Sequence, residues 1–419
     1  VFSGGNPFAS GLTARSRIDV NKISHRWIIL AVLFACRTGL GFQFQTLGSV
    51  SDHLVDIFHF NYAEIGMLIG AFLLPGVVLA VPCGFAGRYT SDRLLVTIGL
   101  VFLALGGAVA VIATSFNMFA LARIICGIGF VVTTIYFTKM VADWFDGKEL
   151  ATAMAVLVMS WPFGIAMGQV GHVLLAALFD WRMAFVAASI YCCLGALGVF
   201  SVYRMPTHAN DHTHSPQLGL PRNELTLTLL ASLVWALFNA GYIVYLSFGA
   251  SVLINGGYEP TGAAAIISLA SWVMLFSGAI CGQISDRFKK PDTILYICLA
   301  GGIASLLLLP WTQFAIGLSL LFGLIGVAPA GIIMALTTQA MAPHRRAFGM
   351  GVFFSSYFLI TTPAPGIAGW LFDTTGIAYW PIVFAATLFL FTGVANAVFR
   401  YVQTRLPRIT NEPLAERDA

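Results

Sequence analysis

One arginine lies in the middle of a long apolar run near the start of the chain. The run reads WIILAVLFACRTGLGFQFQTLGSV, and Arg37 follows Trp27 by ten residues. In a helix with a rise of about 1.5 Å per residue, this places Arg37 about 15 Å from the start of the run. If the run crosses a membrane, a cation at that depth costs at least about 2.5–3.5 kcal/mol. Arg37 must therefore face a wet cavity or a partner.

The helical face of Arg37 indicates what it could bind. At 100° per residue, Gly41, Phe44 and Gln45 lie on the same face, whereas Gln43 points toward another helix. A guanidinium pairs with a carboxylate through two hydrogen bonds, so this face suits an anion. The alternative is a structural ion pair, but no apolar run carries a carboxylate at matching depth. We therefore favour contact with an anionic substrate.

A second arginine and several aromatic residues are further candidates for the same site. Arg123 also lies inside an apolar run, where a cavity and helix packing are equally open readings. The second half of the chain has no deep charge and offers neutral polar and aromatic side chains instead. A neutral, aromatic second half that faces a cationic first half suits a small amphipathic anion such as a monocarboxylate. The candidates there are Asn239, Tyr242, Tyr245, Trp272 and Tyr357.

The composition predicts the elements that position these residues. Of 419 residues, 58% are hydrophobic and 10% are charged, against roughly 25% charged in soluble domains. Apolar runs long enough to span a bilayer are continuous rather than alternating, which favours helices over a barrel. We predict an all-α polytopic membrane protein with twelve transmembrane helices at 27–50, 63–86, 94–113, 117–141, 150–177, 182–203, 225–250, 261–284, 292–310, 314–341, 347–371 and 377–400.

The basic residues predict the orientation of these helices. All of the 22 Lys and Arg residues except Arg37, Arg123 and Arg182 lie at or near helix ends on the side of the two termini. Basic loops stay in the cytoplasm, so we expect a multi-pass protein of the cell (inner) membrane with cytoplasmic N- and C-termini. The expected parts are a tail (1–26), a six-helix bundle (27–204), a linker (205–224), a second six-helix bundle (225–403) and a tail (404–419).

The two halves carry a weak internal repeat. Gly84 and Gly282 end similar segments 198 residues apart, and Phe185 and Phe384 follow similar loops 199 residues apart. These two nearly equal separations indicate a duplication of a six-helix unit. Duplicated bundles around a midplane site are an architecture of transporters.

Three segments resemble motifs of the major facilitator superfamily. GQISDRFKK, residues 282–290, is similar to its loop signature G-x-x-x-D-R-x-x-K/R, and residues 123–129 are similar to its R-x-x-x-G-x-G motif. Residues 161–168 loosely resemble its antiporter motif. The first-half loop departs from the signature because Arg88 stands where Asp is expected, with Asp92 four residues later. The predicted cytoplasmic latch comprises Gly84, Arg88, Asp92, Arg93, Gly282, Asp286, Arg287 and Lys290.

The resemblance implies two pseudo-symmetric six-helix bundles that rock about a central cavity, lined mainly by spans 1, 4, 7 and 10. We expect a secondary transporter of a small anion, first of all an organic carboxylate, with Arg37 as the anchoring charge. A nitrate porter is disfavoured, because the paired arginines of that group belong to spans 2 and 8, where this chain has none at depth. The alternatives are a drug or metabolite exporter of the same superfamily and a non-transporting membrane sensor.

Other classes lack the residues that they need. The sequence shows no nucleophile–base pair, metal cluster or phosphate loop, so we expect no enzyme activity, no catalytic residues, no metal and no cofactor. His208, His212 and His214 in the linker are read as solvated. The expected partners are the substrate and the lipid bilayer, with no nucleic acid, and the expected state is a monomer. Protons remain a candidate coupling ion, carried by the substrate or by an outer carboxylate such as Glu64; exchange and uniport are the alternatives.

Overall fold

The computed structural model describes residues 9–87, 89–145, 149–204, 219–310, 312–342 and 345–406, and every regular element in these ranges is a helix. By length and composition, 11 stretches of the described chain could cross a membrane. The remaining predicted span is also helical, but it is divided at Pro363 into α15 (Arg346–Thr361) and α16 (Ala364–Thr375). The predicted fold of twelve membrane-spanning helices is confirmed.

The first half of the chain supplies six spans. A short helix, α2 (Ser51–Phe58), follows the first span and lies outside the membrane-spanning stretches. The spans are α1 (Ala9–Ser49), α3 (Tyr62–Ala71) with α4 (Pro75–Ala86), α5 (Asp92–Val111), α6 (Phe116–Trp144), α7 (Leu150–Leu178) and α8 (Arg182–Val202).

The second half supplies the other six. Its fourth span is the most irregular, because a π-helical turn and a proline interrupt it. The spans are α9 (Arg222–Asn255), α10 (Pro260–Phe288), α11 (Pro291–Leu308), α12 (Ala315–Leu321) with η2 (Phe322–Gly326), α13 (Ala330–Met334) and α14 (Leu336–Ala340), α15 with α16, and α17 (Trp380–Arg405), while η1 (Thr312–Phe314) precedes α12.

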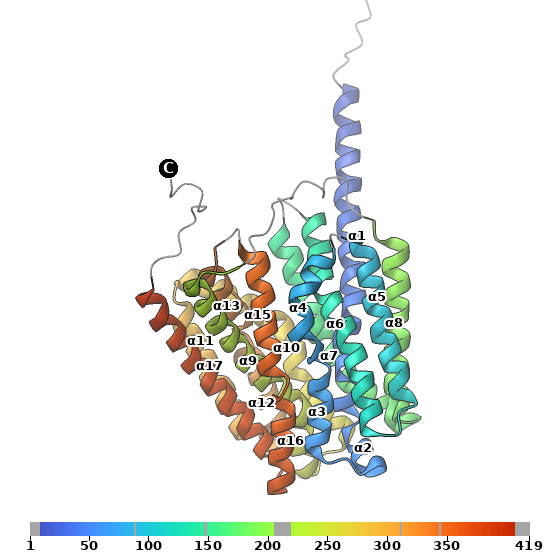
Figure 1. Ribbon diagram of the computed structural model, residues 1–419, viewed down its shortest axis with the longest axis vertical. Coiled ribbons are helices and arrows are strands. Elements are labelled where there is room, and N and C mark those ends of the chain that lie inside the picture. The colour runs from blue at the N-terminus through green and yellow to red at the C-terminus, as the bar shows by residue number, and fades with distance from the viewer. Residues whose placement is uncertain are drawn as a thin grey trace, which may run out of the picture.

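The first helix begins and the last helix ends on the same side of the molecule, which we call the terminal face (Figure 1). The other end, where α2 lies, is the opposite face. Helix α1 begins at Ala9, well before the span that starts at Arg26. The predicted N-terminal tail is therefore helical from residue 9, and the first span is one part of a longer helix.

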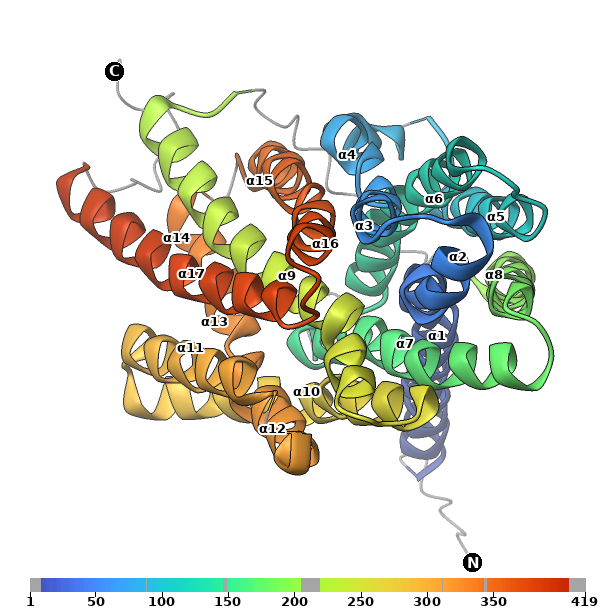
Figure 2. The ribbon, with the colours of Figure 1, turned by 90° about the horizontal axis from the view of Figure 1, so that it is seen from below.

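The two halves stand beside each other, and Figure 2 shows α3 next to α16 and α7 next to α10 along the seam between them. The α3–α16 seam depends on glycine. A Cβ on Gly66 would lie 2.0 Å from the carbonyl oxygen of Pro365, and a Cβ on Gly369 would lie 1.9 Å from that of Tyr62. Backbone atoms of the two halves are thus in direct contact, as small residues permit in membrane helices.

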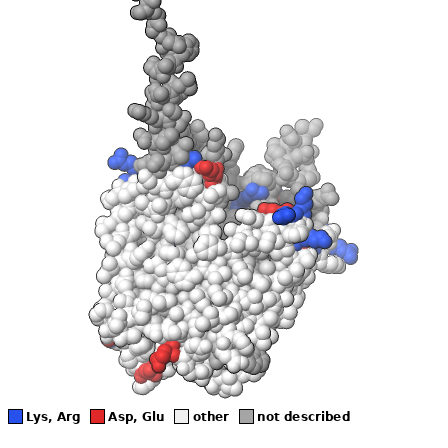
Figure 3. All heavy atoms as spheres, turned by 180° about the vertical axis from the view of Figure 1, so that it is seen from behind, with Lys and Arg blue, Asp and Glu red and all other residues white. Residues whose placement is uncertain are grey.

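The charges of the molecule are segregated along its long axis. On the face seen in Figure 3, the Lys and Arg side chains gather near the terminal face together with some acidic ones, and the charged side chains visible at the other end are acidic. The surface between them is free of charged residues in this view. Large apolar side chains such as Val78 and Leu178 are more than 70% exposed, at 72% and 73%. This is the surface that a bilayer covers.

Candidate functional site

Arg37 joins α1 to α7. Its Nη1 donates to the carbonyl oxygen of Leu157 at 2.8 Å and to Oγ of Ser160 at 2.9 Å, and the carbonyl of Val158 is 3.5 Å away. The residue is 8% exposed, and its Nε is buried with no hydrogen-bond partner. In the ranges that the structure describes, no carboxylate pairs with Arg37.

A proline leaves one of the carbonyls beside Arg37 without a helical donor. Pro162 lies within α7 and has no N–H to donate to the carbonyl of Val158, four residues earlier. The carbonyl of Val158 is therefore open to an outside donor, and Nη1 of Arg37 lies 3.5 Å from it. The shorter bonds of Arg37 go to Ser160 and to the carbonyl of Leu157, which the proline does not free. Ser160 takes part as well, since its hydroxyl donates to Leu157 at 2.6 Å while it accepts from Arg37.

The residues that share a face with Arg37 serve different purposes. A Cβ on Gly41 would lie 2.3 Å from the carbonyl oxygen of Trp161, so the space that this glycine leaves is occupied by α7. Phe44 is 3% exposed. Gln45 is also buried, and its Nε2 lies 3.4 Å from Oγ of Ser49, one turn on. Gln43 bonds a neighbouring helix, as predicted, through Nε2 and the carbonyl of Leu103 at 3.2 Å.

Arg123 has most of its donors engaged inside the first half. Nε donates to the carbonyl of Leu68 at 3.3 Å, and Nη1 and Nη2 donate to the carbonyls of Gln43 and Phe44 at 3.3 and 3.1 Å. Its guanidinium also lies 4.6 Å from the ring centre of Phe72. Of the two readings open from the sequence, these contacts favour helix packing, because they tie α6 to α1 and α3.

A chain of aromatic rings, which we call the aromatic bridge, runs from the first half into the second. Successive ring centres from Phe44 to Trp161, Phe130, Phe358 and Tyr357 are 5.3, 5.0, 6.2 and 4.9 Å apart. The bridge links α1, α7, α6 and α15. It brings the predicted residues Phe44 and Tyr357 into one apolar surface.

Two further predicted residues lie close to this arrangement. Asn239 donates from Nδ2 to the carbonyl of Trp235 at 2.8 Å, and the Trp235 ring is 6.5 Å from that of Tyr357. Trp272 in α10 meets the ring of Phe163 in α7 at 5.3 Å. Phe163 in turn lies 5.6 Å from Phe34, one helical turn from Arg37.

The two remaining tyrosines bond within the second half. The hydroxyl of Tyr242 is 2.7 Å from Oγ of Ser271, and the hydroxyl of Tyr245 donates to Oγ of Ser319 at 3.1 Å. Both tyrosines are buried. Their hydroxyls join α9 to α10 and α12, so these contacts do not connect them with Arg37 or with the aromatic bridge.

The first copy of the predicted latch lies at the terminal face. Asp92, in the first turn of α5, accepts from Nζ of Lys139 at 2.8 Å, and the guanidinium of Arg93 lies 4.3 Å from the ring centre of Phe200. A Cβ on Gly84 would meet nothing within 4 Å. Arg88 lies outside the described residues.

The second copy makes fewer contacts. Gly282 also has open space where a Cβ would lie. Asp286, Arg287 and Lys290 are exposed and form no ion pair within the described ranges. The ion pairs described at the terminal face each join residues of one half: Arg26–Glu149, Lys139–Asp92, Arg345–Glu224 and Arg400–Asp292.

Several residues of this arrangement were not among the sequence candidates. Ser160, Phe130 and Phe358 lie within apolar runs, where nothing in the sequence distinguishes them from packing residues. Trp161 was noted only as part of a loose motif. The mid-span Trp-Pro pair was the available signal, because a proline marks the turn whose carbonyls need another donor.

The described residues contain no group of three or more His, Cys, Asp or Glu side chains that could hold a metal ion. The linker histidines His208, His212 and His214 lie outside these residues. Among the described residues, the structure thus offers no metal ligands at the positions of the candidate site.

Comparison with known proteins places this arrangement in a larger group. Residues 33–365 match the profile of the Major Facilitator Superfamily. A probable L-galactonate transporter of Escherichia coli (strain K12) is 24% identical over 345 residues, which is 74% of this chain and 75% of that protein. A hexuronate transporter of Bacillus subtilis (strain 168) is 23% identical over 390 residues, 86% and 90% of the two chains.

A similar fold is found among solved structures. A bacterial homologue of the human lysosomal transporter Spinster, solved in an inward-facing and unoccupied conformation, superimposes with a TM-score of 0.73. The two chains are 17% identical, and the match covers 93% of this chain and 99% of the other. At this identity the match supports the fold.

Proposed function

The chain belongs to the major facilitator superfamily and is a membrane transporter rather than an enzyme, and from this premise we propose that it carries a small anion, first of all an organic carboxylate. In this proposal the substrate charge is anchored by Arg37. The two halves then rock about the site, so that it opens alternately to the two sides of the membrane.

The state of Arg37 carries the proposal. Its Nη1 is held by α7, whereas Nε is buried without a partner and Nη2 has no hydrogen bond in the described part of the chain. A buried cation without an anion is costly. A carboxylate accepts two parallel hydrogen bonds from one guanidinium, so a carboxylate substrate would supply the missing acceptors and the compensating charge.

The surroundings of Arg37 suit an anion with an apolar part. The aromatic bridge and the Trp272–Phe163 pair both cross the junction between the halves. Gln45 and Asn239 are the nearby neutral polar groups that we assign to substrate hydroxyls or carbonyls. The two relatives described above are named for L-galactonate and hexuronate, and both names denote sugar acids.

The contacts between the halves support alternating access. Near the opposite face, Asp373 of α16 accepts from the backbone N–H groups of Tyr62 and Ala63 in α3. At the terminal face, the described ion pairs stay within one half, and both Gly84 and Gly282 adjoin open space. We assign the terminal face to the cytoplasm because Lys and Arg gather there (Figure 3). The opposite face is closed in this structure, and α4 and α15 of the two halves also pack together toward the terminal face, where a Cβ on Gly351 would lie 3.1 Å from Cγ2 of Val81.

The test compares three variants of the purified chain in a thermal-shift screen against galactonate, hexuronate, lactate and neutral sugars. Arg37→Gln removes the charge. Arg182→Gln removes a partly exposed arginine at the other end of the molecule and is the matched control. Ser160→Ala removes one structural contact of Arg37 and leaves its charge in place.

We expect carboxylates to raise the unfolding temperature of the wild type, the control and Ser160→Ala, but not that of Arg37→Gln. Equal stabilisation of Arg37→Gln and the wild type by a carboxylate would refute the anchoring role. Stabilisation by neutral sugars in place of carboxylates would refute the substrate class.

Transport in liposomes separates the modes of energy coupling. We propose protons as the coupling ion, carried with the substrate, because an acid gradient can drive carboxylate uptake without a carboxylate at mid-depth in the protein. Uptake should then increase when the outside is acidified. A rate that is indifferent to the pH gradient excludes proton coupling and leaves exchange or uniport.

A further inference from the structure

The two halves differ in structure at one pair of equivalent positions at the terminal face. Asp92 and Asp292 each lie in the first turn of the third span of their half, 200 positions apart, and Phe200 and Arg400 are separated by the same interval. This interval is close to the 198 and 199 positions that relate other parts of the repeat. The seam between α5 and α8 in the first half therefore corresponds to the seam between α11 and α17 in the second.

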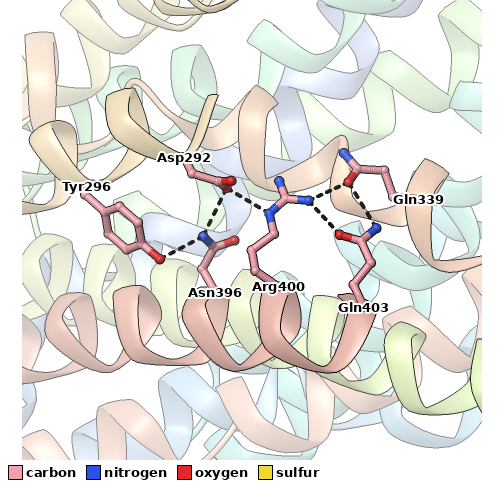
Figure 4. Close-up of polar contacts among 6 residues, drawn as sticks. All are labelled: Asp292, Tyr296, Gln339, Asn396, Arg400 and Gln403. Atoms are coloured by element: carbon pink, nitrogen blue, oxygen red, sulfur yellow. Dashed lines mark hydrogen bonds and ion pairs between the residues drawn. The ribbon is translucent and has the colours of Figure 1, made fainter. Parts of the chain in front are cut away.

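In the second half this seam is filled by a polar network (Figure 4). Arg400 donates from Nε to Asp292 at 2.9 Å and from Nη1 to Oε1 of Gln339 at 2.6 Å. Asn396 donates to Asp292 and to the hydroxyl of Tyr296, both at 3.2 Å. The aspartate thus has an arginine and an amide as partners within its own half.

In the first half the same seam is a cavity of about 480 Å³, within the range of about 300–1,000 Å³ typical of small-molecule sites. Phe200 stands where the second half has Arg400. Nζ of Lys139 donates to Oδ1 of Asp92, whereas Oδ2 is buried without a hydrogen-bond partner. Asp92 is 5% exposed. The lining residues are Ser91, Asp92, Arg93, Leu94, Phe200, Tyr203 and Arg204.

The lining combines two chemistries. Arg93 and Arg204 contribute two guanidinium groups, and the N-terminus of the 20-residue helix α5 adds backbone N–H groups. Leu94 and Phe200 are 41% and 49% exposed on the lateral surface of these spans, where the bilayer lies. The cavity therefore joins a cationic end at the membrane boundary to an apolar surface at the level of lipid chains.

We propose that this cavity holds the head group of an anionic phospholipid. The phosphate lies between Arg93 and Arg204, and the acyl chains lie along Leu94 and Phe200. Basic pockets between helices at the cytoplasmic boundary suit such head groups. The site is separate from Arg37, so it does not depend on the identity of the transported anion.

The test measures phospholipid binding to the purified full chain by native mass spectrometry. The probes are phosphatidylglycerol, phosphatidylcholine and soluble glycerol phosphate. Arg93→Gln with Arg204→Gln removes both cations of the cavity. Arg222→Gln with Arg405→Gln removes two exposed cations at the same face of the second half and is the matched control. Leu94→Trp fills the cavity mouth at a partly exposed position and keeps both arginines.

We expect phosphatidylglycerol to bind the wild type and the control with equal affinity, and the Arg93/Arg204 variant about tenfold or more weakly. Leu94→Trp should weaken binding as well. Undiminished binding to the Arg93/Arg204 variant, or an equal loss in the control, overturns the proposal. So does phosphatidylcholine binding as tight as phosphatidylglycerol. Saturable binding of glycerol phosphate that competes with the lipid would assign the cavity to a soluble phosphate instead.

Discussion

Asp373 in α16 accepts a hydrogen bond of 2.9 Å from the backbone N–H of Tyr62, the first residue of α3. Its second carboxylate oxygen accepts from the N–H of Ala63 at 2.7 Å. A carboxylate at a helix N-terminus satisfies free N–H groups and complements the helix dipole. Because donor and acceptor belong to different halves, the proposed rocking of the halves would break these bonds when the opposite face opens.

Asp373→Asn should favour opening of that face. The amide keeps the size of the side chain but loses its charge, and such a contact is worth about 0.3–2 kcal/mol. Maleimide labelling of a cysteine at Thr362, which lies in the α3–α16 seam, reports the opening once the exposed Cys193 is replaced by serine. We expect labelling to accelerate by about two- to thirtyfold. Asp180→Asn, whose partner Arg182 lies in the same half, is the control; equal rates in both variants would contradict the role of Asp373.

Gly66→Val should prevent the opposite face from closing. A Cβ at this position would lie 2.0 Å from the carbonyl oxygen of Pro365, and backbone cannot yield as a side chain can. We expect the closed state to lose about 1–3 kcal/mol or more and transport in liposomes to fall, with the protein still folded. Gly262→Ala, where a Cβ meets nothing within 4 Å, should transport normally. Full transport by Gly66→Val would show that the seam closes in spite of the larger side chain and would contradict the expectation.

Glu224→Gln should destabilise the second half. Glu224 and Arg345 form a buried ion pair of 2.6 Å, and Glu224 also accepts from the N–H of Ala342 at 3.3 Å. Removing one charge of a buried ion pair costs about 3–5 kcal/mol. Thermal unfolding in detergent measures the loss. The exposed control Glu259→Gln should change stability by less than about 0.5 kcal/mol, and a matching small effect in Glu224→Gln would refute the expectation.

Asp52 should make stability fall with rising pH. Burial raises the pKa of its carboxyl group, and Asp56 raises it further, while His53 acts in the opposite sense. The folded chain thus holds this proton more tightly than the unfolded chain. Its stabilising contribution is complete below the unfolded pKa of about 3.9 and is lost as pH rises through the raised folded value.

Asp52→Asn removes this dependence. The unfolding temperature of the variant relative to the wild type should therefore increase between about pH 4 and pH 7. A difference that stays constant, or decreases, over this range would contradict the assignment. Thermal unfolding at several pH values in one detergent is the required measurement.

The spans could be predicted from sequence because the bilayer imposes a length and a composition on each of them. Even the divided span of α15 and α16 was found, since its break at Pro363 does not interrupt the apolar run. The burial of Arg37 followed from the same reasoning. The depth of a residue depends on its own helix alone.

The contacts around Arg37 required the structure, because they depend on how neighbouring helices are rotated. Gly41 shares a face with Arg37, yet the space beside it is taken by Trp161. The sequence leaves cavity lining and helix packing equally open for Arg123. Its hydrogen bonds to carbonyls on α1 and α3, which favour packing, are visible only in the structure. Phe130 and Phe358 were undetectable as a pair, since they come from different halves and only their rings meet.

Because Pro162 has no amide hydrogen, substitutions at positions 37 and 162 should be coupled in evolution. In a homologue without this proline, the N–H of residue 162 would donate to the carbonyl of Val158. The contact of Arg37 with that carbonyl would then be weaker. A homologue that replaced the arginine first would leave the carbonyl of Val158 without this donor. We therefore expect Arg37 and Pro162 to be inherited together.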